Sequence, residues 1–283
     1  MPFPYKTVLI TGATSGIGLA LAERMIAGGS FVIAVGRRKD RLEHLVAKHG
    51  ADKVAGEAFD IADLAAMPGW VKQITTKYPS LSCIVLNAGF QRTIDFTHPE
   101  SVDLDLHTLE LNTNYLSPLH MTTLFLPHLI SLNSPNKQAA EKLIASIILV
   151  SSGLSIFPFP RCANYSASKA AIHSLAWSLR TQLSSPHSPA TQHIRVIELL
   201  PPAVQTELHT QQEDLVKLGQ DKIGLTLEAY MNETWAELDK GHEEIKDEII
   251  NSAHGEALFR AEAVRKTGFE GFMGALRKMG VKI

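Results

Sequence analysis

A tyrosine and a lysine four positions apart are the residues of this chain best suited to acid–base chemistry. Tyr165 and Lys169 open a segment of helical period, so their side chains are expected on one helix face. A phenol with a pKa of about 10 is a poor base at neutral pH, but a neighbouring ammonium lowers that pKa. The spacing predicts that Tyr165 donates or accepts a proton and that Lys169 lowers its pKa.

A serine pair comes shortly before this helix. Ser151 and Ser152 end an apolar run and are followed by Gly153. A hydroxyl at the end of a strand can hold a substrate oxygen by a hydrogen bond as negative charge develops on it. We assign that role to Ser152.

A glycine-rich turn follows the first apolar run, with the sequence T-G-A-T-S-G-I-G at 11–18. Glycines allow a tight turn and a close approach to a pyrophosphate, and the helix that follows offers free N–H groups. The alternative is a glycine-rich turn between a strand and a helix that binds no ligand. The sequence predicts a phosphate-binding turn made by Gly12, Thr14, Ser15, Gly16, Ile17 and Gly18.

Two arginines, Arg37 and Arg38, follow the second apolar run. A site that prefers NAD usually has an acidic residue there for the ribose 2′-OH, whereas a 2′-phosphate calls for arginine. The alternative is a basic first turn on a surface helix. The pair favours NADP(H) over NAD(H), with NAD(H) still possible.

Apolar β-branched runs alternate with segments of helical period up to about residue 200, which is typical of parallel strands joined by crossover helices. The pattern predicts an α/β fold with a doubly wound parallel sheet, the Rossmann fold. Strands are expected at 6–11, 31–35, 53–58, 82–86, 145–151 and 193–199, and helices at 16–28, 39–49, 63–77, 101–132 and 164–184. Ligands of such sheets bind at the carboxyl ends of the strands.

The whole chain, 1–283, is expected to form one Rossmann-type domain. Residues 1–205 would be its nucleotide-binding and catalytic core. Residues 206–283 read as a helical substrate-side extension without a further strand, serving either as a cap over the site or as surface packing or a dimer contact. The polar segment 133–142 reads as a surface insertion.

Composition excludes several classes of function. With 27 basic and 29 acidic residues the net charge is -2, which gives no footprint for nucleic acid or an anionic membrane. No apolar stretch approaches the ~20 residues of a membrane span. Cys83 and Cys162 suit a reducing compartment, and an apolar strand begins too early for a secretory leader, so a cytoplasmic protein is expected. The twelve histidines show no metal-ligand spacing, and no metal is expected.

Taken together, the motifs resemble the short-chain dehydrogenase/reductase family. The resemblance spans roughly residues 6 to 206 and rests on the glycine turn, on Asn87-Ala88-Gly89, on Ser152 and on Y-x-x-x-K at 165–169. It implies that a nicotinamide exchanges hydride with a ketone, aldehyde or alcohol while Tyr165 moves the proton. The fourth catalytic residue would be Asn114, which steadies a water next to Lys169, with Asn112 as the second choice.

The resemblance also implies further cofactor contacts and an assembly. Lys169 and Tyr165 would bind the nicotinamide ribose. The other implied contacts are Asp60, Ile61, Asn87, Ala88, Gly89, Val204 and Thr206. The family's usual last-strand sequence has no counterpart in the tail, so a homodimer through helices 101–132 and 164–184 is expected rather than a tetramer.

One departure from the family pattern suggests a subgroup. Pro201-Pro202-Ala203-Val204 has proline where the family usually has glycine, which fixes φ and removes an N–H. Together with Thr206-Glu207-Leu208-His209, it resembles the DltE-like subgroup, named after an oxidoreductase-like protein of a lipoteichoic-acid D-alanylation operon.

Apolar side chains suggest a small-molecule substrate with an apolar or aromatic carbonyl. Those expected to wall the site are Phe90, Leu154, Phe157 and Phe159, although they could equally pack against the extension.

Two other classes of function compete with this interpretation. Ser166–Lys169 fits S-x-x-K and Lys266–Gly268 reads K-T-G, two marks of penicillin-binding serine hydrolases. The other is a nucleotide-sensing protein that keeps the fold without useful turnover.

Overall fold

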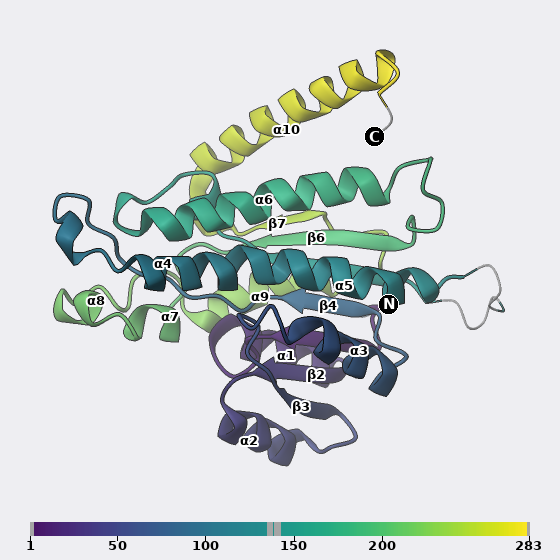
Figure 1. Ribbon diagram of the computed structural model, residues 1–283, viewed down its shortest axis with the longest axis horizontal. Helices are drawn as coiled ribbons and strands as arrows, with labels where there is room; N and C mark the ends of the chain where they lie inside the picture. The colour runs from purple at the N-terminus through teal and green to yellow at the C-terminus, as the bar shows by residue number, and fades with distance from the viewer. Residues whose placement is uncertain (1–2, 135–137, 139–142, 282–283) are drawn as a thin grey trace.

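The fold is organised around one parallel sheet (Figure 1). In the computed structural model, which describes residues 3–134, 138 and 143–281, the strands run in the order β3-β2-β1-β4-β5-β6-β7, and every neighbouring pair is parallel. They are β1 (Thr7–Thr11), β2 (Phe31–Gly36), β3 (Val54–Ala58), β4 (Cys83–Leu86), β5 (Ala145–Val150), β6 (Ile194–Leu200) and β7 (Glu248–Ile250). The order reverses between β1 and β4, which is where an open α/β sheet binds its ligand. The predicted doubly wound sheet is confirmed.

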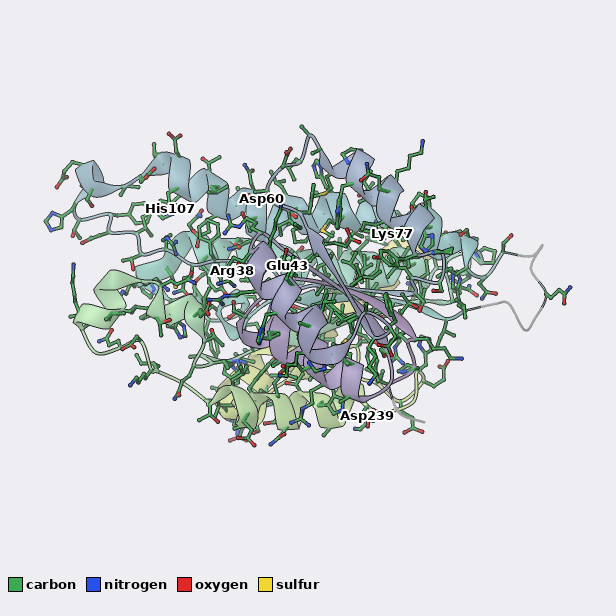
Figure 2. All side chains as sticks on the ribbon, turned by 90° about the horizontal axis from the view of Figure 1, so that it is seen from below. Arg38, Glu43, Asp60, Lys77, His107 and Asp239 are labelled. Atoms are coloured by element: carbon green, nitrogen blue, oxygen red, sulfur yellow. The ribbon has the colours of Figure 1, made fainter. Side chains whose placement is uncertain are left out.

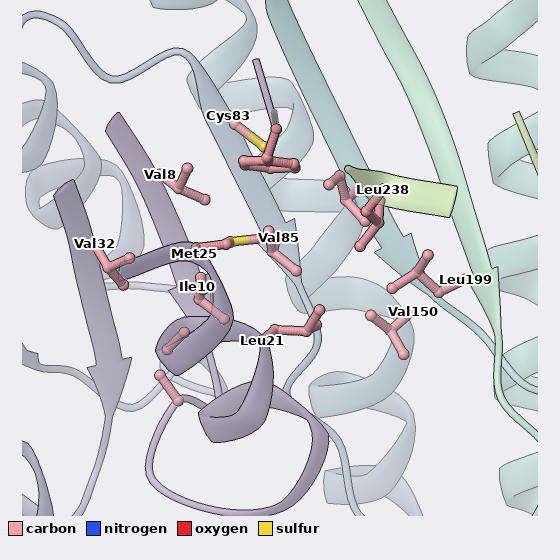
Figure 3. Close-up of a cluster of buried hydrophobic side chains, with 14 of the residues drawn as sticks. Val8, Ile10, Leu21, Met25, Val32, Cys83, Val85, Val150, Leu199 and Leu238 are labelled. Atoms are coloured by element: carbon pink, nitrogen blue, oxygen red, sulfur yellow. The ribbon is translucent and has the colours of Figure 1, made fainter. Parts of the chain in front are cut away.

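Helices cover both faces of the sheet because successive strand residues point to opposite sides. Val8 and Ile10 pack with helices α1 and α9, whereas Leu9 packs with α3, α5 and α6. Figure 3 shows the first cluster, with Leu21 and Met25 of α1 lying against β1. The helices are α1 (Gly16–Ala27), α2 (Lys39–His49), α3 (Met67–Lys77), α4 (Leu104–Leu111), α5 (Ser117–Ser131), α6 (Ala163–Leu183), α7 (Glu207–Thr210), α8 (Glu213–Lys217), α9 (Leu227–Leu238) and α10 (Gly255–Lys278). Within the described part of the chain, none of them is long and apolar enough to span a bilayer.

The long helix expected at 101–132 is divided in the structure. A π-helix at Asn112–Leu116 separates α4 from α5, and α4 begins only at Leu104, where the Asp103 side chain accepts a hydrogen bond from the Leu106 N–H. π-Helical turns occur frequently at functional sites. Here the wider turn carries Asn114, whose side chain is almost fully buried.

The expectation that the extension has no further strand was wrong. Strand β7 pairs with β6 through Glu198–Glu248, Leu199–Ile249 and Leu200–Ile250. It is only three residues long and buries one of them, Ile249, so periodicity gives almost no signal for it. The insertion expected at 133–142 lies mostly outside the described residues.

Helix α1 crosses close to the end of β1 because position 18 has no side chain. A Cβ on Gly18 would lie 2.4 Å from the Gly12 carbonyl oxygen and 2.4 Å from Asn87 Nδ2. Both distances are far below van der Waals contact, and one of the atoms belongs to the backbone. The glycine therefore fixes how α1 packs against β1 and β4.

We predict that Gly18→Ala lowers the free energy of unfolding by about 1–3 kcal/mol or more, because the added methyl must push backbone aside. Gly271→Ala is the matched control, since nothing lies within 4 Å of that position in α10. It should be neutral or stabilise by up to about 1 kcal/mol. Urea unfolding followed by circular dichroism measures both, and equal stability of the two variants would contradict this packing.

A buried ionic cluster anchors α10 to α6. The fully buried His173 of α6 hydrogen-bonds Glu198 of β6 through Nδ1 (3.0 Å), and its Nε2 lies 3.1 Å from Glu262 of α10. Arg180 lies 3.7 Å from Glu198. Burial by itself would lower the pKa of His173, but Glu198 and Glu262 outweigh it and raise the pKa to about 9. The imidazolium is thus the form that this cluster stabilises.

The cluster should make stability fall with rising pH. Because the pKa of His173 is higher in the folded protein than its ordinary value of 6.5, the stabilisation is complete below about pH 6.5 and is lost as the pH rises through about 9. Relative to His173→Gln, the wild type should lose on the order of 1–3 kcal/mol over that range. Denaturant unfolding at several pH values tests this. His98→Gln, which removes an exposed histidine, should follow the wild type, and the same pH dependence in His173→Gln would refute the assignment.

Candidate active site

A cavity of about 530 Å³ opens at the carboxyl ends of β1, β2, β4, β5 and β6. Most of the residues proposed from the sequence line it. They are Gly12, Thr14, Ser15, Gly16, Ile17, Arg37, Arg38, Asp60, Ile61, Asn87, Ala88, Gly89, Phe90, Ser152, Leu154, Phe159, Tyr165, Lys169, Val204 and Thr206. Gly18, Asn114 and Phe157 lie outside the lining. The glycine turn and the tyrosine–lysine pair thus share one cavity.

Tyr165 and Lys169 lie on the first turns of α6, and both are almost fully buried. Lys169 Nζ lies 5.5 Å from the centroid of the Tyr165 ring and donates a hydrogen bond to the Val150 carbonyl oxygen (2.8 Å). Since Val150 ends β5, this bond ties the face of α6 that carries Lys169 to the strand that leads into Ser152.

Burial shifts both groups toward their neutral forms. It raises the pKa of the Tyr165 phenol, with a further rise from Cys162 and Glu110 and an opposing hydrogen bond with Ser152. It lowers the pKa of Lys169 to about 8, although the carboxylates of Glu110 and Glu198 act against the shift. In this structure the ammonium is engaged with Val150, and the phenol is held as an acid.

Asn114 lies behind this pair and joins the loop after β4 to α6. Its Oδ1 accepts a hydrogen bond from the Phe90 N–H (3.0 Å), and its Nδ2 donates to the Phe90 carbonyl oxygen (2.9 Å) and to Ser168 Oγ (3.2 Å). Gly89 fits closely here, because a Cβ on it would lie 2.9 Å from Asn114 Oδ1 and 3.6 Å from Lys169 Nζ. Of the two asparagines considered from the sequence, Asn114 is therefore the one beside Lys169.

The ends of β1 and β4 are joined by one threonine that the sequence analysis had given no role. Thr11 Oγ1 donates to the Val85 carbonyl oxygen (3.3 Å) and accepts from the N–H groups of Asn87 (3.0 Å) and Ala88 (3.1 Å). Asn87 Nδ2 in turn donates to the Thr11 carbonyl oxygen (3.0 Å). The Asn87 side chain thus hydrogen-bonds the first residue of the glycine turn.

The glycine turn lies directly against the loop after β4. Gly12 has φ of 70°, which favours glycine, and a Cβ there would lie 2.9 Å from Ala88 Cα. Next to it, the hydroxyl oxygens of Thr14 and Ser15 accept hydrogen bonds from Arg38 Nη2, each at 2.7 Å. The N-terminus of α1, the two hydroxyls and the guanidinium together fit the phosphates of a dinucleotide.

The two arginines after β2 are held differently. Arg37 is largely exposed, and its guanidinium lies 3.7 Å from Asp60. Arg38 is half-buried against the glycine turn and also donates to Glu207 Oε2 (2.7 Å). Figure 2 shows Arg38 beside the green segment of the extension and Asp60 farther from that segment.

The loop after β6 lines the cavity next to the glycine turn. Val204 forms a bridge with Leu225, and Gln205 N–H donates to the Leu225 carbonyl oxygen (2.9 Å). Thr206 caps α7 by accepting from the Leu208 N–H, and its Cβ lies 3.3 Å from a Cβ built on Gly16. The proline-containing loop is thus fixed at the end that leads into α7.

The described residues add a part of the site that sequence reasoning missed. Three apolar residues of the extension, Leu208, Leu215 and Ile223, line the cavity together with Phe90, Leu154 and Phe159. Phe157, although as exposed as Phe159, is not among the residues that line the cavity. The segment 207–223 is polar on average, so the sequence does not single out which of its residues reach the cavity. Helix α10 projects away from the cavity side of the sheet (Figure 1) and does not cover it.

His254 of the extension packs behind the serine loop. Its Nε2 lies 2.8 Å from the Leu200 carbonyl oxygen, and a Cβ on Gly153 would lie 2.1 Å from its Cε1. The residue after Ser152 therefore has to be glycine as long as His254 occupies this place.

The hydrolase motifs are not assembled. Lys266–Gly268 lies inside α10 rather than on a strand, and Ser166 is buried with its Oγ accepting from the Phe159 N–H (3.2 Å). Within the described residues, no group of three or more metal-ligating side chains is placed to hold a metal ion.

Comparison with known proteins agrees with the geometry. The family model for short chain dehydrogenases matches residues 6–216. An uncharacterised oxidoreductase of Bacillus subtilis, DltE, is 36% identical over 253 residues, covering 88% of this chain and 91% of the relative. A benzil reductase of Saccharomyces cerevisiae that forms (S)-benzoin is 30% identical over 207 residues, covering 72% and 73%.

Solved structures share the fold. A short-chain dehydrogenase from Sphingobium yanoikuyae, in complex with NADPH, superimposes with a TM-score of 0.74 at 22% identity and covers 94% of this chain and 95% of its own. One from Burkholderia phymatum, in complex with NAD, gives 0.74 at 19% identity and covers 95% and 96%. With its parallel sheet, its glycine turn and its match to the family model over most of its length, this chain belongs to the short-chain dehydrogenase/reductase family of oxidoreductases.

Proposed function

We propose that the protein interconverts a ketone or aldehyde and the matching alcohol with NADP(H) as its cofactor. The observation that carries this proposal is that Tyr165, Ser152 and Lys169 open onto the same cavity as the glycine turn and Arg38. When bound, the nicotinamide supplies or accepts the hydride. The protein has to orient the substrate oxygen and move one proton.

Tyr165 is the group proposed to move that proton. Because burial raises its pKa, the phenol is neutral at physiological pH and can donate to a carbonyl oxygen as negative charge develops there. The Ser152 hydroxyl, which shares a hydrogen bond with the phenol, would polarise the same oxygen.

Lys169 and Asn114 would support the tyrosine. Once Lys169 turns its ammonium toward the phenol, that charge would lower the pKa of Tyr165 and allow the reverse, oxidative reaction. Asn114 would steady a water beside Lys169, and Gly89 leaves room close to both side chains.

The cofactor contacts follow from the lining of the cavity. Arg37 and Arg38 supply two cations at the end of β2, where an NAD site would have a carboxylate. Ile61 and the exposed Asp60, which lies beside Arg37, would contact adenine, whereas Val204 and Thr206 would contact the nicotinamide half of the cofactor.

The substrate is proposed to be an apolar or aromatic carbonyl compound. Phe90, Leu154 and Phe159 form one apolar wall, and residues of the extension form another. The similarity to a benzil reductase makes aromatic ketones the first compounds to test.

We further propose a cytoplasmic homodimer made through α4, α5 and α6. Helix α4 exposes Leu104, Leu109 and Leu111, an apolar set that a second copy could cover. Both cysteines are free and buried, which suits a reducing compartment.

Tyr165→Phe should abolish turnover of benzil with NADPH, a fall of at least about 10²–10⁴-fold, because the variant lacks the proton donor. NADPH binding, followed by nicotinamide fluorescence, should persist. Tyr78→Phe is the control, since it removes a hydroxyl that bonds Glu57 on the surface near β3. Turnover retained by Tyr165→Phe would refute the role of Tyr165 as proton donor. If the wild type binds NADPH but turns over none of a panel of aromatic and aliphatic ketones, quinones and steroids, that result would favour a nucleotide-sensing protein.

Arg38→Ala should weaken NADPH binding about tenfold or more and leave NADH binding nearly unchanged, because charge-assisted hydrogen bonds to the 2′-phosphate are lost. Arg37→Ala should act in the same direction and more weakly, since that side chain is mostly exposed. Arg260→Ala, on the exposed face of α10, is the control. Unchanged NADPH preference in Arg37→Ala or in Arg38→Ala would remove that arginine from the role.

A further inference from the structure

A carboxylate from the extension lies among the arginines that follow β2. Glu207 opens α7, and its Oε2 accepts a hydrogen bond from Arg38 Nη1 (2.7 Å) while its Oε1 accepts one from Arg41 Nη1 (2.5 Å). Both Arg38 and Glu207 line the cavity. Its Oε2 also accepts a hydrogen bond from Gln211 Nε2 of the same segment (3.2 Å). The carboxylate therefore bridges two guanidiniums.

The remaining donors of Arg38 face the glycine turn. Its Nε and Nη2 donate to Thr14 Oγ1 at 3.1 and 2.7 Å, and Nη2 also donates to Ser15 Oγ. Arg41 Nη1 is shared in the same way, between Glu207 and the Thr14 carbonyl oxygen (3.2 Å). An anion that approaches from the cavity therefore meets the donors that Glu207 holds.

We propose that Glu207 occupies the donors of the 2′-phosphate and has to be displaced when NADP(H) binds, which makes it a specificity-determining residue. This inference rests on the proposed use of NADP(H). A phosphate monoester carries a charge of about −1.5 to −2 on three acceptor oxygens, against one charge on the carboxylate. The phosphate therefore wins the exchange, but Glu207 lowers its affinity.

The exchange links the type of cofactor to the substrate side of the cavity. Helix α7 carries Leu208 and His209, which line the cavity, and its contacts with the arginines run through Glu207. When the phosphate takes those donors, α7 loses its attachment to Arg38 and Arg41. NADH carries no 2′-phosphate and leaves that attachment in place.

The first test is the affinity of Glu207→Gln, which removes the charge and keeps the size of the side chain. We expect NADPH to bind about three- to tenfold more tightly than to the wild type, and NADH to change by less than about twofold. Adenosine 2′,5′-bisphosphate, which lacks the nicotinamide, should show the same gain. Glu256→Gln is the matched control, because it removes the carboxylate of an exposed ion pair with Arg260 on α10 (2.5 Å).

The second test is hydrogen exchange of the peptide that covers α7. In the wild type, NADPH should increase exchange there and NADH should not. In Glu207→Gln, exchange should already be raised before any nucleotide is added.

Three outcomes overturn the inference. If Glu207→Gln binds NADPH no more tightly than the wild type while Arg38→Ala still loses it, Glu207 does not compete and the cofactor proposal stands. If Glu207→Gln loses NADH affinity, the carboxylate accepts from a ribose hydroxyl instead. If neither arginine variant affects NADPH binding, the cofactor proposal and this inference fail together.

Discussion

The hydrogen bonds of Thr11 are the constraint on which the rest of the site depends. They join the ends of β1 and β4 at the point where the strand order reverses, so they set the distance between the glycine turn and the Asn87–Gly89 loop. That loop leads directly to Phe90, which is held by Asn114, and Asn114 contacts the helix of Tyr165. The hydrogen bonds of Thr11 and Asn114 thus connect the glycine turn to the helix of Tyr165.

The two ends of the site use electrostatics in opposite ways. At the end that carries Tyr165 and Lys169, burial disfavours charge on both groups, because it raises the pKa of the phenol and lowers the pKa of the ammonium. Behind it, His173 is kept charged by the carboxylates of Glu198 and Glu262. Lys169 and His173 are four residues apart on α6. Burial lowers the pKa of the first, whereas carboxylate partners raise the pKa of the second, so one helix carries both situations.

What the sequence could predict was local. The strands that form the core, the glycine turn and the Tyr165–Lys169 pair follow from spacing and periodicity, because neighbouring residues along the chain determine them. The π-helix around Asn114 and the strand at Glu248–Ile250 depend on packing against distant elements, and so does the contact of Glu207 with Arg38. Phe157 is apolar like Leu154 and Phe159, and only the path of the loop decides that the latter two line the cavity and Phe157 does not.

The packing of His254 on Gly153 restricts how this chain can evolve. Any side chain at position 153 would collide with the imidazole, while loss of the imidazole would leave the Leu200 carbonyl oxygen without its partner. Neither position can change freely unless the other changes as well. The two should therefore be inherited as a compensating pair, and a homologue with a shorter tail would be free to carry a larger residue directly after the serine that corresponds to Ser152.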